Sequence, residues 1–178
     1  MAKTWQTNHR SKAKKNNRHT KYDALAARRV LRDAYRAKID FSAALDSDNL
    51  ATIHLRWVTA VTILRAVGHA LQKLDTSRSC ALRAAIDSAW DRWKSQSFQH
   101  LIFNEFIEKE RNMILKEYRS SLFPSPSEKK KMPDAPIIYS EILIGDRIYS
   151  PLEAIEASIV WWEAELWQIE AQAGNPNP

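Results

Sequence analysis

The sequence predicts an all-α protein, a bundle of about five helices with a short β-hairpin before the last helix. Apolar residues recur at spacings of three and four over several long stretches, which is the pattern of amphipathic helices. Only 3 glycines occur in 178 residues, too few for the many tight turns of a sandwich or barrel and for a glycine loop that binds phosphate. These observations favour a single helical domain over residues 21–172, preceded by a basic arm (1–20) and followed by a tail (173–178).

The first two helices are predicted over residues 22–45 and 50–74. Leu25, Leu31 and Tyr35 support the first helix, and the sequence DSDN ends it and caps the second. The second helix carries one continuous apolar stripe with alternating spacings of three and four: Leu50, Ile53, Trp57, Ala60, Leu64, Val67, Leu71 and Leu74. We therefore expect a long helix with a single buried face.

A third helix is predicted from about Ser79 to Trp93, and a fourth from Ser95 or Ser97 to about Ser121. The apolar stripe of the third helix comprises Leu82, Ile86, Ala89, Trp90 and Trp93. The one cysteine of the chain, Cys80, can form neither an intramolecular disulfide nor a cysteine metal cluster. We expect its side chain to be buried.

The last third of the chain combines a loop, a hairpin and a helix. Residues 122–136 are rich in proline and lysine, contain four of the seven prolines, and should form a loop. Residues 137–150 are rich in Ile and Tyr around Gly145-Asp146, which predicts a β-hairpin. Pro151 then begins the last helix, whose apolar stripe is Leu152, Ile155, Ile159, Trp162 and Leu166.

The tryptophans are expected in the core or at an interface, and the carboxylates of the last helix are expected in solvent. Helical spacing predicts core positions for Trp90 and Trp162, whereas one narrow stripe cannot bury both Trp161 and Trp167. One of these two is therefore expected at an interface. We expect a solvated acidic face with no histidine near it: Glu153, Glu156, Glu163, Glu165 and Glu170.

Positive charge is concentrated at the N-terminus. Residues 1–38 contain 12 Lys or Arg against two Asp, a net charge of +10, while the remaining 140 residues carry a net charge of −4. Such asymmetry favours a tail that contacts polyanions, and a solvated leader without a partner is the alternative. The candidate nucleic-acid-binding residues are Lys12, Lys14, Lys15, Arg18, Lys21 and, on the fourth helix, Lys116.

Several classes of protein are not favoured by the sequence. No apolar run approaches the roughly 20 residues that span a bilayer, and no apolar stretch follows the basic residues of the N-terminus. No metal-ligand spacing such as HExxH occurs. We therefore expect a cytoplasmic protein without a metal site, a cofactor or a membrane partner.

The stretch FIEKERNMILKEY, residues 106–118, places an arginine on an apolar helix face. At about 100° per residue, four apolar side chains fall within about 40° of Arg111, namely Ile107, Leu115, Tyr118 and Leu122. Asn104 shares this line, and Glu108 is positioned to pair with Arg111. A buried charge must be paired or hydrogen-bonded. Two interpretations remain open: a buried polar network that fixes helix register or a dimer interface, and a site that lines a cleft.

Arg111-Asn112, with a polar residue five positions after Arg111 on a helix of a small α-bundle, resembles the signature of HEPN-domain proteins. In that superfamily an Arg, often followed by a polar residue, precedes a His by a spacer of four to six residues. The resemblance covers residues 50–120 in helix layout. It implies an all-α homodimer associated with RNA, and many members are metal-independent ribonucleases of prokaryotic defence or toxin–antitoxin pairs.

The resemblance also implies roles for individual residues. Arg111, Asn112 and Glu108 become the candidate catalytic residues, facing a cleft between subunits, with Arg111 holding phosphate. The chain departs from the family pattern at Lys116, which stands where the family has His. A lysine, with a reference pKa of about 10.4, is a poor base near neutrality. The departure puts cleavage in doubt and leaves RNA binding as the expectation.

Two other functions remain open. The chain could be a non-enzymatic protein–protein interaction module or inhibitor that uses the tryptophan-rich last helix and the hairpin edge, with Arg111 in a core ion pair. Alternatively, nucleic-acid binding could reside in the basic arm alone, with a helical body that only dimerises.

Overall fold

The computed structural model describes residues 24–47, 49–123, 130–131 and 141–174. The basic arm and most of the predicted loop, together with residues 137–140 of the predicted hairpin, lie outside the described residues. The described elements are α1 (Ala26–Leu45), α2 (Leu50–Ala70), η1 (Leu71–Asp75), α3 (Cys80–Ser95), η2 (Ser97–Gln99), η3 (Ile102–Ile107), α4 (Glu108–Glu117), β1 (Ile142–Ile144), β2 (Arg147–Tyr149) and α6 (Pro151–Gln172). The predicted all-α bundle with a hairpin before its last helix is confirmed.

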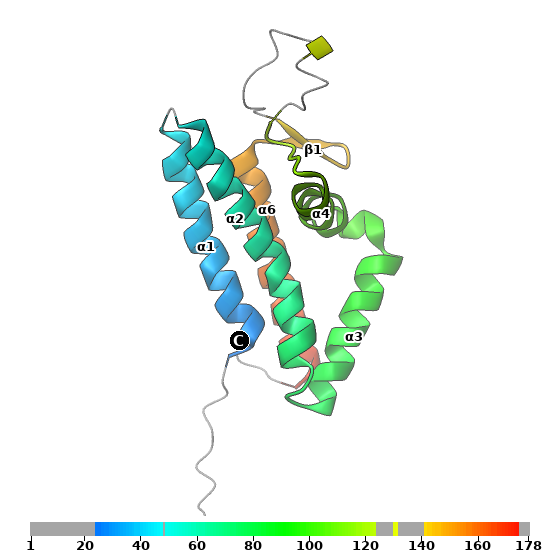
Figure 1. Cartoon of the computed structure of the whole chain (residues 1–178). Helices are drawn as coiled ribbons and strands as arrows, with labels where there is room; N and C mark the ends of the chain where they lie inside the picture. The colour runs from blue at the N-terminus through cyan, green and yellow to red at the C-terminus, as the bar shows by residue number, and fades with distance from the viewer. Residues whose placement is uncertain (1–23, 48, 124–129, 132–140, 175–178) are drawn as a thin grey trace, which may run out of the picture.

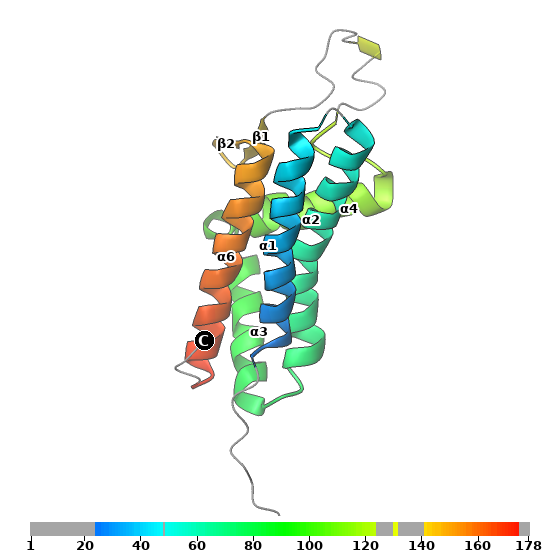
Figure 2. The ribbon, with the colours of Figure 1, turned by 90° about the vertical axis from the view of Figure 1, so that its left-hand side faces the viewer.

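Three long helices lie side by side, α3 runs roughly along them, and α4 packs across them (Figure 1 and Figure 2). In Figure 2, α6, α1 and α2 form a row, with α3 behind it. Figure 1 shows α4 almost end-on, so that it crosses the long helices at a steep angle, close to the hairpin. The core between these layers is rich in aromatic rings: Trp93, Phe103, Trp161 and Trp162 contact one another at ring-centroid distances of 4.7–5.9 Å.

The long helix α2 is the centre of the bundle. Asn49 caps it by accepting a hydrogen bond from the Thr52 amide at 3.0 Å. Its predicted stripe is buried from Ile53 to Leu71, but the outermost members Leu50 and Leu74 are exposed, as is Tyr35 of α1. The stripe therefore extends further in sequence than the neighbouring helices can cover.

One described helix, Leu50–Asp75, is long and apolar enough to cross a membrane by length and composition alone. Core helices of soluble proteins meet the same criterion. Trp57 and Leu64 of this segment are fully buried within the bundle, and 33% of its most apolar window is buried.

Helix α1 receives its N-terminal cap from a distant part of the chain. Its own preceding residue, Leu25, has no capping side chain. Instead, the buried carboxylate of Asp75 accepts hydrogen bonds from the amides of Ala26 and Ala27 at 2.8 and 3.0 Å. These amides are among the donors that a helix leaves unsatisfied, and a negative charge at the positive end of the helix dipole is favourable. Asp75, which follows the predicted end of the second helix, thus also links that helix to α1.

The predicted fourth helix is divided into three elements. A short 3₁₀ turn, η2, precedes His100, and the π-helical segment η3 leads into α4. Helix α4 ends at Glu117, because Tyr118 adopts the left-handed conformation with φ of 53°. The helix is therefore shorter than predicted, and a π-helical segment shifts the rotational phase of the residues that follow it.

The hairpin and the start of α6 agree with the sequence, with shorter strands than expected. Strands β1 and β2 pair antiparallel, Ile144 opposite Arg147, around Gly145 with φ of 63°. Ser150 and Glu153 form a reciprocal capping box, and Pro151 occupies the first turn of α6. The hairpin lies against η3, where Glu105 Oε2 accepts a hydrogen bond from the Gly145 amide at 3.0 Å.

Two predictions about burial are wrong. Cys80 is exposed at the start of α3. Two carboxylates of α6, Glu165 and Glu170, are buried rather than solvated. Both are paired with arginines of neighbouring helices, Glu165 with Arg92 and Glu170 with Arg28, so their burial is compensated by charge and hydrogen bonds.

Candidate functional site

The polar side chain that α4 places in the core is Glu110, the neighbour of Arg111. Glu110 is only 1% exposed. Its carboxylate accepts hydrogen bonds from Trp57 Nε1 and the Ser121 amide, each at 2.9 Å, and from the Ser121 hydroxyl. These donors come from α2 and from the chain just after α4. They satisfy a group that would be costly to bury alone.

Arg111 lies at the edge of the buried face, so the prediction that it occupies the middle is wrong. Residues 107, 110 and 114 form the buried line of α4, and Leu115 is exposed. Tyr118 and Leu122, which drew the predicted face towards Arg111, follow the end of the helix. From Ile107, positions 110 and 111 are the i+3 and i+4 neighbours. Sequence spacing alone does not decide between them.

Arg111, Glu108 and Asn104, the three polar residues predicted to cluster on one helix face, have separate partners. Arg111 is half-buried and donates a hydrogen bond from an Nη atom to Oδ1 of Asn112 at 2.9 Å. Glu108 pairs with Arg65 of α2 at 3.4 Å instead of with Arg111. Asn104 donates to the carbonyls of Trp93 and His100. The predicted polar network is therefore not formed.

Arg111 and Arg65 nevertheless belong to one cationic surface between α2 and α4. The Arg65 guanidinium lies 5.7 Å from the Trp90 ring centre and 6.0 Å from that of Phe103, distances at which a cation is attracted to a ring face. Burial lowers the pKa of Arg65, the Glu108 carboxylate opposes this shift, and the Arg111 charge adds to it. Among the described residues, no carboxylate lies within ion-pair distance of Arg111.

Of the remaining predicted nucleic-acid-binding residues, one lies on α4 and the others lie outside the described residues. Lys116 is exposed near the end of α4, and Arg119 lies just beyond it, paired with Glu117 at 3.7 Å. The arm residues Lys12, Lys14, Lys15, Arg18 and Lys21 lie outside the described residues. The part of the site that the structure describes is therefore the α2–α4 surface with Arg65, Glu108, Arg111 and Asn112.

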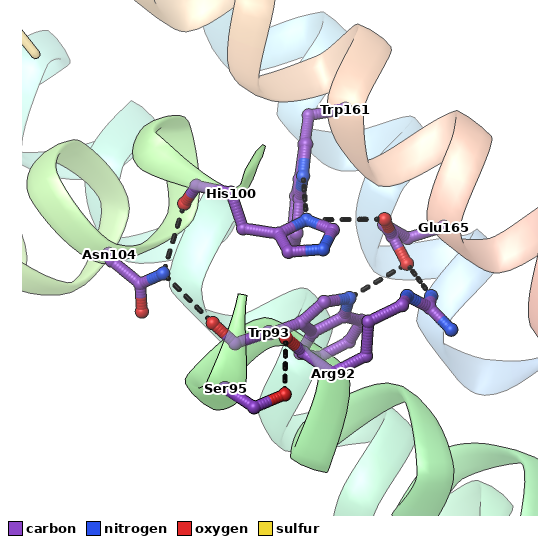
Figure 3. Close-up of polar contacts among 7 residues, drawn as sticks. All are labelled: Arg92, Trp93, Ser95, His100, Asn104, Trp161 and Glu165. Atoms are coloured by element: carbon purple, nitrogen blue, oxygen red, sulfur yellow. Dashed lines mark hydrogen bonds and ion pairs between the residues drawn. The ribbon is translucent and has the colours of Figure 1, made fainter. Parts of the chain in front are cut away.

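A second polar cluster, which sequence reasoning missed, joins α3 to α6 (Figure 3). Glu165 accepts hydrogen bonds from Arg92 and from Trp93 Nε1, the latter at 2.7 Å. His100 Nδ1 accepts a hydrogen bond from Trp161 Nε1 at 3.2 Å and lies 3.5 Å from Glu165 Oε1. The prediction that no histidine lies near these carboxylates is therefore wrong. Trp90 and Trp162, predicted above as core residues, mark the two helices but not the histidine between them.

The surroundings of His100 favour its neutral form. The residue is 6% exposed, and its Nε2 has no hydrogen-bond partner among the described residues. Burial lowers the pKa of His100, Glu165 opposes this shift, and Arg92 adds to it. His100 packs edge-on against the Trp161 ring at a centroid distance of 5.9 Å and faces the already paired Glu165 carboxylate, so it contributes to packing at the α3–α6 junction.

The tryptophans divide between core and surface. Trp162 and Trp93 are fully buried, while Trp90 and Trp161 are half-buried and pack against the core. Trp167 is 56% exposed, which identifies it as the member of the Trp161–Trp167 pair that faces outward. In the part of the chain that the structure describes, no group of three or more His, Cys, Asp or Glu side chains could hold a metal ion.

Comparison with protein-family models, curated proteins and solved structures finds no match to this chain. The resemblance to HEPN-domain proteins therefore remains a prediction that rests on Arg111, Asn112 and the helix layout.

Proposed function

We propose that this protein binds RNA through the α2–α4 surface and does not cleave it, as a HEPN-like helical protein. The observation that carries the proposal is Arg111, a half-buried cation whose hydrogen-bond partner is the neutral side chain of Asn112. Because no described carboxylate pairs with Arg111, an external anion can accept hydrogen bonds from its guanidinium group. Arg fits phosphate well, since its planar guanidinium can donate two parallel hydrogen bonds.

The neighbouring charges favour an anionic ligand. The Arg111 charge lowers the pKa of Arg65, and among the described residues the carboxylate paired with Arg65 is that of Glu108. Lys116 and Arg119 extend the positive potential along the end of α4. Residues 1–38, which include the basic arm and carry a net charge of +10, would add further contacts with phosphate.

Binding without cleavage follows from the available proton-transfer groups. Lys116, which stands where the family has His, is exposed and carries an amine that is a poor base near neutrality. Of the described histidines, His100 lies buried at the α3–α6 junction with its Nδ1 occupied by the Trp161 N–H, and His54 and His69 lie on α2, away from the sequence position of the family's His. The proposal thus keeps the RNA association and the homodimer that the resemblance implies and leaves out the ribonuclease chemistry.

The test compares two single-charge variants in binding to a labelled single-stranded RNA. Losing one charge-assisted contact should weaken binding by about tenfold in Arg111→Met, with a shallower salt dependence. Lys94→Ala removes an exposed charge of α3 and should bind within about twofold of the parent. Parent-level affinity of Arg111→Met would contradict the proposal, as would RNA cleavage by the parent that depends on Arg111.

A second candidate function is favoured by the outer face of α6. Val160 and Trp167 are both more than half exposed, and exposed tryptophan is typical of protein interfaces. The protein-interaction module therefore remains a proposal with this face as its surface. Trp167→Glu should leave RNA binding unchanged and abolish self-association, measured by light scattering, if this face forms the homodimer.

A further inference from the structure

A groove between α2 and α4 is separate from the hydrogen bonds of Arg111. It has a volume of ≈ 500 Å³ and is lined by Ala51, His54, Leu55, Val58, Ile114, Leu115, Tyr118 and Arg119. The two walls come from the N-terminal half of α2 and the C-terminal end of α4. Most of this lining is apolar, so the groove offers water little hydrogen bonding.

Three large side chains stand exposed around this groove. Leu55 is 61% exposed, Leu115 is 49% exposed, and Tyr118 is 94% exposed. Single exposed leucines are ordinary, but apolar side chains gathered from two helices around one groove are typical of an interaction surface. Covering these side chains with a partner would remove their apolar surface from water, which is favourable.

Tyr118 is placed at the groove by an unfavourable backbone conformation. It is the one non-glycine residue with positive φ among the described residues. A helix usually ends with glycine at such a left-handed position, because a β-carbon is strained there. The chain thus places a bulky aromatic residue where glycine would stabilise the fold, and the ring is almost entirely exposed. Strain of this kind is typical of binding sites.

The charge around the groove selects the ligand. The eight lining residues include Arg119 and His54 and no carboxylate. Arg119 is offset only by a solvent-exposed pair with Glu117 at 3.7 Å, a kind of pair that contributes little. Arg119 is the one lining residue with a permanent charge, and it stands at the end of the groove beyond α4. The groove therefore has an apolar floor and a positive rim.

We propose that this groove binds an amphipathic segment of a partner protein, with aliphatic anchors for Leu55 and Leu115 and with carboxylates for the basic rim. Helix-in-groove recognition uses anchors spaced i, i+4 and i+7, and electrostatic complementarity sets the choice of partner. A protein segment fits better than RNA, because the walls carry aliphatic side chains, whereas single-stranded RNA favours aromatic stacking platforms. The protein would therefore hold RNA and a protein partner on adjacent surfaces.

The probe is a fluorescein-labelled 15-residue peptide with leucines at i, i+4 and i+7 and glutamates at its other positions. A second peptide carries lysines in place of the glutamates. The parent protein should bind the acidic peptide saturably in fluorescence anisotropy and bind the basic peptide at least tenfold more weakly. Absence of saturable binding, or equal binding of the two peptides, would overturn the proposal.

Matched variants locate the binding in the groove. Leu55→Asp and Leu115→Asp should each weaken acidic-peptide binding at least tenfold, while Ile39→Asp, an equally exposed change on α1, should not. Arg119→Glu should abolish the preference for the acidic peptide. If the aspartate variants bind as the parent does, the groove is not the site and the proposal fails.

Tyr118→Gly separates binding from folding. Relief of the left-handed strain should raise the midpoint of urea unfolding, whereas loss of the exposed ring should weaken acidic-peptide binding. A variant that is more stable and binds as well as the parent would remove Tyr118 from the site.

Sedimentation without peptide completes the test. Self-association that Leu55→Asp abolishes would mean that a second copy of the protein fills the groove, and this outcome also overturns the proposal.

Discussion

At the scale of single residues, Glu110 is the side chain on which α4 depends. Its carboxylate receives a donor from Trp57 of α2 and two donors from Ser121, beyond the end of α4. One residue therefore fixes α4 against α2 and folds the following chain back over the helix. Its neighbour Arg111, among the described residues, donates a hydrogen bond only to the adjacent Asn112 side chain.

Glu110→Ala should destabilise the protein strongly, because it leaves the Trp57 and Ser121 donors buried without an acceptor. We expect a loss of about 2–4 kcal/mol in the free energy of unfolding, measured by urea denaturation. Glu117→Ala removes an exposed carboxylate from the same helix and should change stability by less than about 0.5 kcal/mol. Similar stabilities for the two variants would show that the Glu110 bonds contribute little.

At the scale of elements, the hairpin is attached to η3 at its turn. Gly145 has φ of 63°, and a β-carbon at this position would lie 2.6 Å from Leu101 Cδ1. The Gly145 amide donates to Glu105 of η3. Both the turn conformation and the close approach require glycine here. A strand of three residues could not hold this position by pairing alone.

Gly145→Ala should lower the free energy of unfolding by about 2 kcal/mol, through backbone strain and the clash with Leu101. Adding Leu101→Ala should relieve the clash but not the strain, so the double variant should lose less than the sum of the two single variants. Urea denaturation of all four proteins measures this coupling. Strictly additive losses would show that the side chain of Leu101 yields without cost.

At the scale of the whole molecule, four buried carboxylates connect the helices. Asp75 caps α1 from the end of η1, Glu110 joins α4 to α2, Glu165 joins α6 to α3, and Glu170 joins α6 to α1. Each receives at least two donors, so each satisfies the requirement for burial. Breaking any one leaves an uncompensated group, which makes these bonds specific for one packing arrangement of the helices.

The stability of the whole protein should fall on acidification below about pH 6.5, because His100 is buried as the neutral form. Its folded-state pKa is lowered, so the unfolded chain binds more protons in this range and stability rises with pH across it. Thermal unfolding at pH 7.0 and 5.5 measures the effect. His100→Gln, which retains an acceptor for Trp161 and does not titrate, should reduce the difference, whereas the exposed control His69→Gln should not. An unchanged difference in His100→Gln would refute this assignment.

The sequence by itself determined most elements of this protein, although not the division of the predicted fourth helix into η2, η3 and α4. The three- and four-residue spacing in α2 and α6, the caps at Asn49 and Ser150, and Gly145-Asp146 at the hairpin turn are local signals, because each acts within a few residues of chain. The tertiary structure decided which polar residues became buried. Glu110 rather than Arg111 enters the core because α4 ends before Tyr118 and because Trp57 and Ser121 supply donors, and Glu165 is buried because Arg92 and Trp93 of α3 supply donors. Local pattern fixes a helix face to within about one residue, whereas the burial of a charge requires partners from distant segments.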